Sequence, residues 1–159
     1  MTRLQASITT PLPIDQAFDF VADFANSSLW DPGVATSIRA VDPNATGAST
    51  ILGVGSSFQL GVRMRGRVAP MEYRITRFER PSRVTLAGSG SNVTAVDDIQ
   101  FSPTATGGTK VDYTADIHLG GWMRLVEPLA GGAFRKLAAN ALNGMQRALD
   151  ERAAEATPA

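Results

Sequence analysis

Asp97 is the residue whose place in the sequence suggests chemistry most directly. Every second residue from 93 to 101 is apolar except Asp97, so a strand here would put its carboxyl group on the same face as Ile99 and Phe101. A carboxylate on an apolar face is costly unless it is paired. Either a one-residue shift or a β-bulge turns Asp97 outward beside Asp98, or Asp97 faces the interior and is paired or used there.

Tyr73 and Tyr113 are the other candidates for chemistry, since each shares a face with apolar residues of its own predicted strand. If Asp97 faces the interior, we expect it to accept a hydrogen bond from a ligand hydroxyl group or from one of these tyrosines, or to act as a base with a raised pKa. In an apolar pocket, a tyrosine ring packs while its hydroxyl group orients a ligand. Ordinary core packing of both rings is the alternative.

The residue inventory excludes several kinds of site. The chain has no cysteine and one histidine, so cysteine nucleophiles, disulfides and multi-histidine metal sites are excluded. His118 shares the outer face of its predicted strand with Asp116, which argues against a role as general base. Gly88 and Gly90 lack the third glycine of a phosphate-binding loop, and we interpret them as hairpin residues. We expect no metal and no cofactor.

The orientation of these candidate side chains depends on a series of predicted strands that lies between two helical regions. Residues 4–9 alternate like a strand, residues 14–24 show helical spacing after Pro13, and a short second helix is expected at residues 26–29. Six further strands are expected between proline and glycine turns, at about residues 34–41, 58–64, 71–75, 84–86, 93–101 and 111–119. Short connections make consecutive strands antiparallel, and such a sheet buries one face.

A long amphipathic helix is the natural cover for that face. Apolar residues recur at helical spacing from Phe134 to Leu149 opposite a charged side, and we expect the preceding stretch from Trp122 to Gly132 to be irregular. Gly144 inside this helix costs up to ~1 kcal/mol relative to alanine. Either a ligand or a neighbouring strand approaches closely at Gly144, or ordinary packing explains it.

Length and composition indicate one domain and exclude some partners. With 159 residues, 43% of them hydrophobic, the chain can build a core without disulfides or metal. We predict one domain over residues 1–153 and a disordered tail over 154–159. Fifteen basic and fifteen acidic residues give no net charge, which argues against nucleic acid as a partner. No signal peptide or bilayer-spanning run is found, so we expect a cytoplasmic monomer or homodimer without stable membrane insertion.

Arginine is concentrated in the middle strands and their turns. The arginines concerned are Arg63, Arg65, Arg67, Arg74, Arg77, Arg80 and Arg83. We favour a solvated sheet face whose charge is balanced by acidic residues of the later strands, namely Asp97, Asp98, Asp112 and Asp116. The alternative is an entrance that attracts a carboxylate, a phosphate headgroup or an anionic lipid surface.

Several short motifs occur in a recognisable order. They are Pro13 before Ala17-Phe18 and Val21, Trp30-Asp31-Pro32, Tyr73-Arg74-Ile75-Thr76, Asp98-Ile99-Gln100-Phe101, Gly108-Thr109-Lys110-Val111 and Pro128. In this order they resemble the START-like (SRPBCC) polyketide cyclase/dehydrase and lipid-transport family over nearly the whole chain. The resemblance implies an α+β helix-grip fold, in which a seven-stranded curved antiparallel sheet wraps around a long C-terminal helix, with two short helices between strands 1 and 2.

The resemblance also implies an apolar pocket that holds lipids, polyketides or quinones. We expect a carrier or binding protein for a hydrophobic small molecule. The alternative is a cofactor-independent polyketide cyclase or dehydratase, in which Asp97, Tyr73 or Tyr113 moves protons. Trp30 either closes the pocket or staples the short helix to the sheet. The predicted ligand-binding residues are Trp30, Phe58, Leu60, Val62, Met71, Tyr73, Ile75, Asp97, Ile99, Tyr113, Phe134, Leu137, Ala141 and Met145.

Overall fold

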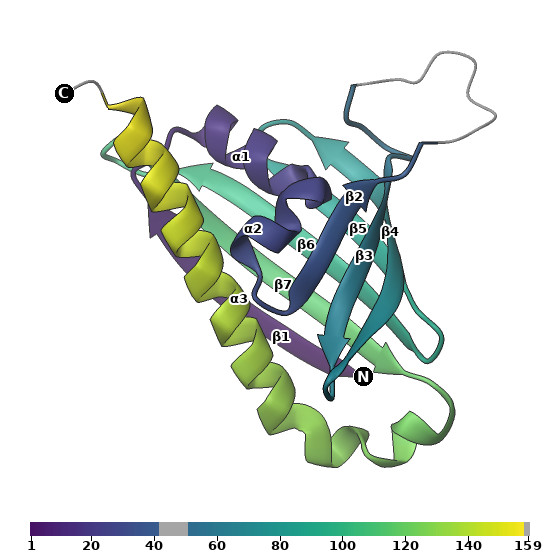
Figure 1. Ribbon diagram of the computed structural model, residues 1–159. Helices are drawn as coiled ribbons and strands as arrows, with labels where there is room; N and C mark the ends of the chain where they lie inside the picture. The colour runs from purple at the N-terminus through teal and green to yellow at the C-terminus, as the bar shows by residue number, and fades with distance from the viewer. Residues whose placement is uncertain (42–50, 158–159) are drawn as a thin grey trace.

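Seven strands form one antiparallel sheet that curves around the long C-terminal helix, as the sequence predicts (Figure 1). The computed structural model describes residues 1–41 and 51–157. The strand order is β1-β7-β6-β5-β4-β3-β2, so β1 and β2 form the two edges. The strands are β1 (Thr2–Thr10), β2 (Val34–Arg39), β3 (Ser57–Met64), β4 (Arg67–Glu79), β5 (Arg83–Ser89), β6 (Val93–Pro103) and β7 (Thr109–Leu119).

Two short helices follow β1, α1 (Ile14–Ala22) and α2 (Ser27–Trp30), joined by the 3-10 turn η1 (Phe24–Asn26). Pro13 precedes α1 with φ −58°, the value its ring favours, and so costs the helix no hydrogen bond. On the inner face of α1, the ring of Phe18 meets Phe78 and Phe101 edge-on, each at 5.2 Å between ring centroids. These contacts attach α1 to β4 and β6.

The C-terminal helix α3 (Glu127–Ala156) is longer at both ends than the sequence suggests. It begins at Glu127, with Pro128 in its first turn, and continues through Gly131 and Gly132, so most of the stretch expected to be irregular before Phe134 is helical. Only the short 3-10 helix η2 (Gly121–Leu125) precedes it. At the other end, the expected tail contributes the last turn of α3, where the Thr157 hydroxyl group donates to the Ala153 carbonyl oxygen at 3.0 Å.

Gly144 is the point where α3 touches α2. A Cβ atom at this position would lie 1.8 Å from the carbonyl oxygen of Trp30, far inside van der Waals contact. The close approach predicted for this glycine is therefore made by the end of α2, not by a ligand or a strand. A larger residue would push α3 away from α2.

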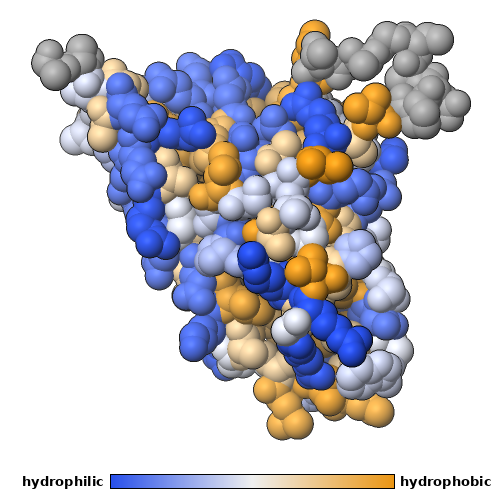
Figure 2. All heavy atoms as spheres, in the orientation of Figure 1, coloured by the Kyte–Doolittle hydropathy of each residue, from blue (hydrophilic) through white to orange (hydrophobic). Residues whose placement is uncertain are grey.

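Large apolar side chains are exposed at one end of the molecule. Trp122 is 61% exposed, Leu125 82% and Leu129 87%. Figure 2 shows apolar side chains gathered at the lower end, where Figure 1 places η2 and the beginning of α3. The guanidinium group of Arg65, in the turn between β3 and β4, lies 6.0 Å from the Trp122 ring, so this turn and η2 are neighbours.

Candidate ligand-binding site

A cavity of about 200 Å³ lies between the sheet and the first half of α3. Leu142, Met145 and Leu149 in the second half of α3 are buried in the core, whereas Phe134 and Ala138 in the first half are only partly buried. The helix thus closes on the sheet at one end and leaves space at the other. Leu137 lines this space and is 49% exposed, which places it where the cavity opens to solvent.

Asp97 faces this cavity. The pairing of β6 runs without a shift on both sides, with Asp97 opposite Leu86 of β5 and Ala115 of β7. Its side chain is 5% exposed and belongs to the cavity wall. The alternative of a shifted register or bulge that turns Asp97 outward is therefore wrong. The register shifts in the described sheet lie instead in the β2 and β4 pairings, between Val34 and Thr36 and between Ile75 and Arg77.

Tyr113 and Tyr73 lie with Asp97 on the cavity wall, and their hydroxyl groups act on the pKa of the Asp97 carboxyl group as hydrogen-bond donors. Burial raises the pKa of Asp97 to about 7, although the two tyrosine hydrogen bonds act in the opposite direction by stabilising the charged form. Burial, and then the charge of Asp97, holds the pKa of each tyrosine well above its usual value, so both hydroxyl groups keep their protons. The arrangement joins one titrating carboxyl group to two neutral donors.

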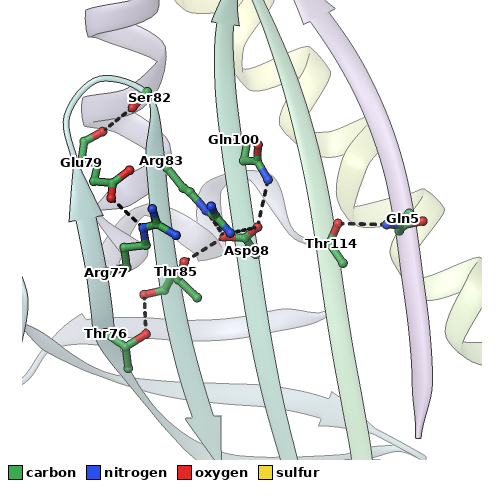
Figure 3. Close-up of polar contacts among 10 residues, drawn as sticks. All are labelled: Gln5, Thr76, Arg77, Glu79, Ser82, Arg83, Thr85, Asp98, Gln100 and Thr114. Atoms are coloured by element: carbon green, nitrogen blue, oxygen red, sulfur yellow. Dashed lines mark hydrogen bonds and ion pairs between the residues drawn. The ribbon is translucent and has the colours of Figure 1, made fainter.

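Asp98, the next residue of β6, lies on the outer face of the sheet and has several hydrogen-bond donors around it. Its carboxylate accepts hydrogen bonds from Arg83 at 2.8 Å, Thr85 at 2.8 Å and Gln100 at 3.1 Å, all on the outer face of the sheet (Figure 3). Burial alone would raise the pKa of Asp98, but these bonds together lower it below its ordinary value. The two adjacent aspartates thus have opposite environments: Asp98 is paired with Arg83, whereas no ion pair is found for Asp97 among the described residues.

Gly88 makes room for Tyr73. The two residues are directly opposite each other in the β4 and β5 pair, and a Cβ atom at Gly88 would lie 2.5 Å from a ring carbon of Tyr73. The Tyr73 ring therefore covers the backbone of Gly88. We predicted a hairpin residue here, but Gly88 lies inside β5 and its function is to seat the tyrosine that contacts Asp97.

Asp31 is a second carboxyl group on the cavity wall, which the sequence analysis did not select. It follows α2, and its Oδ1 atom accepts a hydrogen bond from the Gly33 amide at 2.7 Å. Burial raises its pKa, while that amide bond acts to lower it. Its position in the Trp30-Asp31-Pro32 motif was visible in the sequence, but only the fold brings this turn to face β6.

The structure brings most of the predicted ligand-binding residues together. Those that line the cavity are Trp30, Leu60, Val62, Met71, Tyr73, Asp97, Tyr113, Phe134, Leu137 and Ala141. Four others are not on its wall but are packed in the buried core: Phe58, Ile75, Ile99 and Met145. They share the inner faces of their elements, yet they lie where the sheet, α1 and the second half of α3 are in contact. Alternation along a strand shows on which face of the sheet a residue lies. It does not show whether that residue lies beside the cavity or in the packed core.

Sequence reasoning missed the contribution of the edge strand β1 and the ends of several elements. The additional residues on the wall are Leu4, Gln5, Ala6, Phe24, Ser27, Asp31, Gly33, Val34, Arg63, Met64, Val93, Ala95, Ala115, Ile117, Ala138 and Leu142. Ala95, Ala115 and Ile117 belong to alternating sets already recognised, so their position was accessible from the pattern. The small alanines among them leave the space that bulkier residues would fill.

Trp30 both holds α2 against the neighbouring elements and forms part of the cavity wall. It is 4% exposed, and its ring lies 6.1 Å from that of Phe24 and 6.5 Å from that of Tyr113. Its backbone carbonyl meets Gly144 of α3. The indole Nε1 atom is buried and has no hydrogen-bond partner within the described part of the chain. Trp30 therefore links α2, β7 and α3 beside the tyrosine that holds Asp97.

His118 is exposed on the outer face, as the alternation predicts, and is therefore not among the cavity residues. The expected charge balance on that face is correct only for Asp98, which pairs with Arg83 at 2.8 Å. Asp112 and Asp116 pair instead with Lys110 and Arg3, and Asp97 faces the other way. Arg80 contacts Asp19 and Asp15 of α1. The partners of Arg77 and Arg74 lie two positions away in β4, namely Glu79 and Glu72.

Within residues 1–41 and 51–157, no group of three or more histidine, aspartate or glutamate side chains is placed to hold a metal ion. In the same residues, no helix combines the length and apolar character needed to cross a membrane.

The sequence and the fold were compared with known proteins. Residues 1–155 match the family model described as polyketide cyclase / dehydrase and lipid transport. No curated protein matches the sequence.

Solved structures share the fold at low sequence identity. A START superfamily protein from Mycobacterium smegmatis is 15% identical, with a TM-score of 0.71 over 99% of this chain and 100% of its own. The Zhui aromatase/cyclase from Streptomyces sp. R1128 is 11% identical, with a TM-score of 0.75 over 94% of each chain. A protein from Thermus thermophilus is 14% identical, with a TM-score of 0.74 over 98% of this chain and 99% of its own. Because the family model spans almost the full length, the chain belongs to the polyketide cyclase/dehydrase and lipid transport family.

Proposed function

We propose that this protein binds a hydrophobic small molecule, of the lipid, polyketide or quinone kind, in the cavity between α3 and the sheet, as a carrier or binding protein. The observation that carries the proposal is the cavity itself, about 200 Å³ in volume and lined mostly by apolar side chains. Moving apolar ligand surface from water into it contributes about 25 cal/mol per Å². For comparison, an apolar cavity of about 150 Å³ in another protein is large enough to hold benzene.

The opening of the cavity supports an exchangeable ligand. Phe134 and Leu137 of α3 and Met64 at the end of β3 all line the cavity, and Leu137 is 49% exposed. Most residues from 131 to 140 are exposed, so this part of α3 is less buried than the part that follows. We infer that a ligand enters and leaves between this part of α3 and the turn that follows β3.

Native mass spectrometry of protein purified from its own host tests this function. We expect an additional mass from one retained small molecule, which is released on denaturation. Ala138 lines the cavity and its neighbour Ala139 is exposed, so they form a matched pair for substitution. Ala138→Trp should abolish the additional mass and Ala139→Trp should keep it. Equal retention by both folded variants would contradict binding in this cavity.

An enzyme of the cyclase or dehydratase type is the second candidate, and the environment of Asp97 favours it. A carboxyl group with a pKa of about 7 can take up and release a proton near neutral pH, and this one faces the cavity between two tyrosines. In such a reaction Asp97 would remove a proton from carbon beside a ligand carbonyl. The new carbanion would attack a second carbonyl carbon of the same molecule, and the protonated Asp97 would return its proton to the alkoxide that forms. Asp97 would then remove a second proton from the carbon beside the first carbonyl, the C–O bond of the new alcohol would break, and hydroxide would leave with that proton as water.

The molecules retained by two variants separate the enzyme from the carrier. If the protein is an enzyme, Asp97→Asn purified from the same host should retain a molecule heavier by one water than the molecule retained by the unmodified protein. If it is a carrier, both proteins should retain the same mass. Tyr113→Phe gives a second comparison, because it removes a hydroxyl group while keeping the ring beside Trp30.

We also propose that the protein acts in the cytoplasm as a monomer or homodimer. Fractionation of host cells tests the location, and light scattering on the purified protein tests the assembly. Recovery of the protein from the periplasm or the medium, or a mass above that of two chains, would contradict this proposal.

A further inference from the structure

The hydrogen-bonding capacity of Asp97 is only partly used inside the protein. A carboxylate has about four positions at which it can accept a hydrogen bond. Two are taken by Tyr113 and Tyr73, and no third donor contacts Asp97 among the residues that the structure describes. The strands on either side place Leu86 and Ala115 opposite Asp97, and neither side chain has a polar group. The remaining capacity is directed to the cavity.

The two tyrosines cannot supply a donor to a ligand while they hold the carboxylate. Each hydroxyl group has one hydrogen atom, which is given to Asp97, and what it still offers is a lone pair. When Asp97 is ionised, the centre formed by Asp97, Tyr73 and Tyr113 is therefore rich in acceptors and has no free hydrogen. A molecule bound against it gains most when it brings a hydrogen of its own.

The wall also carries donors outside this centre, namely the guanidinium group of Arg63 and the indole N–H of Trp30, which is buried and has no hydrogen-bond partner among the described residues. Ser27 donates its hydroxyl hydrogen to the Phe24 carbonyl oxygen at 2.7 Å, and Arg63 donates to the Pro32 carbonyl oxygen at 3.0 Å. Asp31 accepts a bond from an amide and adds further acceptor capacity.

We propose that the cavity selects hydrophobic molecules that carry a hydrogen-bond donor, a hydroxyl group or an amine, and that this donor binds to Asp97 between Tyr73 and Tyr113. The inference rests on the proposed binding function and adds the chemical class of the ligand. An apolar molecule without a donor would cover the Asp97 carboxylate without forming a hydrogen bond to it. The unsatisfied acceptor positions would lower the affinity of the protein for that molecule. An ether or a ketone would in addition place its lone pairs against those of the site.

Three naphthalene derivatives test this selection, because they share one apolar body. They are 2-naphthol with a hydroxyl donor, 2-(aminomethyl)naphthalene with an amine donor, and 2-methoxynaphthalene with none. Affinities are measured by calorimetric titration at pH 8, where the Asp97 carboxyl group is ionised. We expect at least one of the two donor compounds to bind about tenfold or more tightly than the ether, since a hydrogen bond to a charged group has this effect. The donor that binds more tightly identifies the preferred class.

Asp97→Asn and Asp98→Asn form a matched pair of variants for the same titrations. The first removes the charge that faces the cavity, and the second removes the charge of the adjacent residue on the outer face. We expect Asp97→Asn to reduce the preference for the donor to threefold or less and Asp98→Asn to leave it unchanged. Tyr113→Phe keeps the carboxylate and should retain a clear preference.

Each outcome has a definite meaning. If the ether binds as tightly as both donors to the unmodified protein, the inference is wrong while the proposed binding function stands. The same holds if the preference survives in Asp97→Asn. If none of the three compounds binds, the result contradicts the proposed function, and with it the inference.

Discussion

The Tyr73 ring lies directly against the backbone of Gly88 across the β4 and β5 pair, where a single methyl group on the glycine would reach within 2.5 Å of a ring carbon. The hydroxyl group of the same tyrosine hydrogen-bonds to Asp97. The position of a polar contact in the cavity thus depends on the absence of a side chain on the neighbouring strand.

Gly88→Ala should therefore move Tyr73 and weaken its hydrogen bond to Asp97. We expect a loss of about 1–3 kcal/mol in the free energy of unfolding, because a partly buried ring that packs against the core is forced from its rotamer. Urea denaturation measures this loss. Gly53→Ala is the control, since nothing lies within 4 Å of its added methyl group. If Gly88→Ala costs no more than Gly53→Ala, the ring does not depend on this glycine.

Gly144→Ala should destabilise the protein although alanine is the better helix former. The new methyl group would lie 1.8 Å from the Trp30 carbonyl oxygen, so α3 and α2 must separate. We expect a cost of at least about 2 kcal/mol, set by overpacking.

The same helix provides the control for Gly144. Gly131→Ala and Gly132→Ala add a methyl group with nothing within 4 Å, and each should raise stability by up to ~1 kcal/mol through helix propensity. Thermal unfolding of the three single variants measures the difference in sign. Stabilisation by all three would show that α3 does not approach Trp30 in this way.

Asp97 should make the folded protein less stable as the pH rises. Its pKa is about 7 in the folded state against about 3.9 in an unfolded chain, so the folded state binds more protons between these values. Stability from this group is greatest below pH 4 to 5 and is lost through pH 7, by up to about 4 kcal/mol at pH 8. Asp97→Asn, which cannot ionise, should gain stability relative to the unmodified protein between pH 5 and pH 8.

The groups around Asp97 support a raised pKa, and with it a loss of stability as the pH rises. Tyr73 and Tyr113 remain neutral over this range, because their pKa values are well above 10. The negative charges of Asp31 in the cavity and Asp116 on the outer face both act to raise the pKa of Asp97. Asp98→Asn is the control with the opposite sign, since the pKa of Asp98 is lowered. A stability difference between Asp97→Asn and the unmodified protein that does not change with pH would refute the raised pKa.

Filling the cavity should abolish binding without unfolding the protein. Ala138 faces the space from α3, and a tryptophan there would occupy the volume that a ligand needs. We expect the affinity of Ala138→Trp for 2-naphthol to fall by more than tenfold, with little change in the thermal midpoint. Ala139→Trp, on the exposed side of the same helix, should bind as the unmodified protein does. Equal affinities in the two variants would place the ligand elsewhere.

The sequence predicted the face of each strand residue well, and the reason is local. Alternation is a property of one strand, so it put Tyr113 on the inner face before any partner strand was known. The same pattern put Asp97 on the inner face unless a shift or bulge turned it outward, and the strand pairing decides between the two. Alternation could not show which of the inner residues line the cavity, because the position of the cavity depends on where α3 separates from the sheet. Ile99 and Asp97 share a face of β6, yet Ile99 packs in the core and Asp97 lines the cavity.

The start of α3 and the role of Gly88 were also not predicted, because both depend on the folded structure and not on a local sequence pattern. The stretch from Trp122 to Gly132 was expected to be irregular, but α3 begins at Glu127 and continues through Gly131 and Gly132, whose low helix propensity is tolerated there. The Gly88 contact with Tyr73 joins residues 15 positions apart through strand pairing, which no local pattern shows.

The crystal structure of the protein with 6-bromo-2-naphthol tests the central claim most directly, because the anomalous signal of bromine locates the molecule without ambiguity. We expect the bromine among Phe134, Leu137 and the other apolar residues at the opening, and the hydroxyl group within hydrogen-bond distance of the Asp97 carboxyl group. A bromine peak only on the outer surface, or a cavity closed by movement of α3 onto the sheet, would contradict the account.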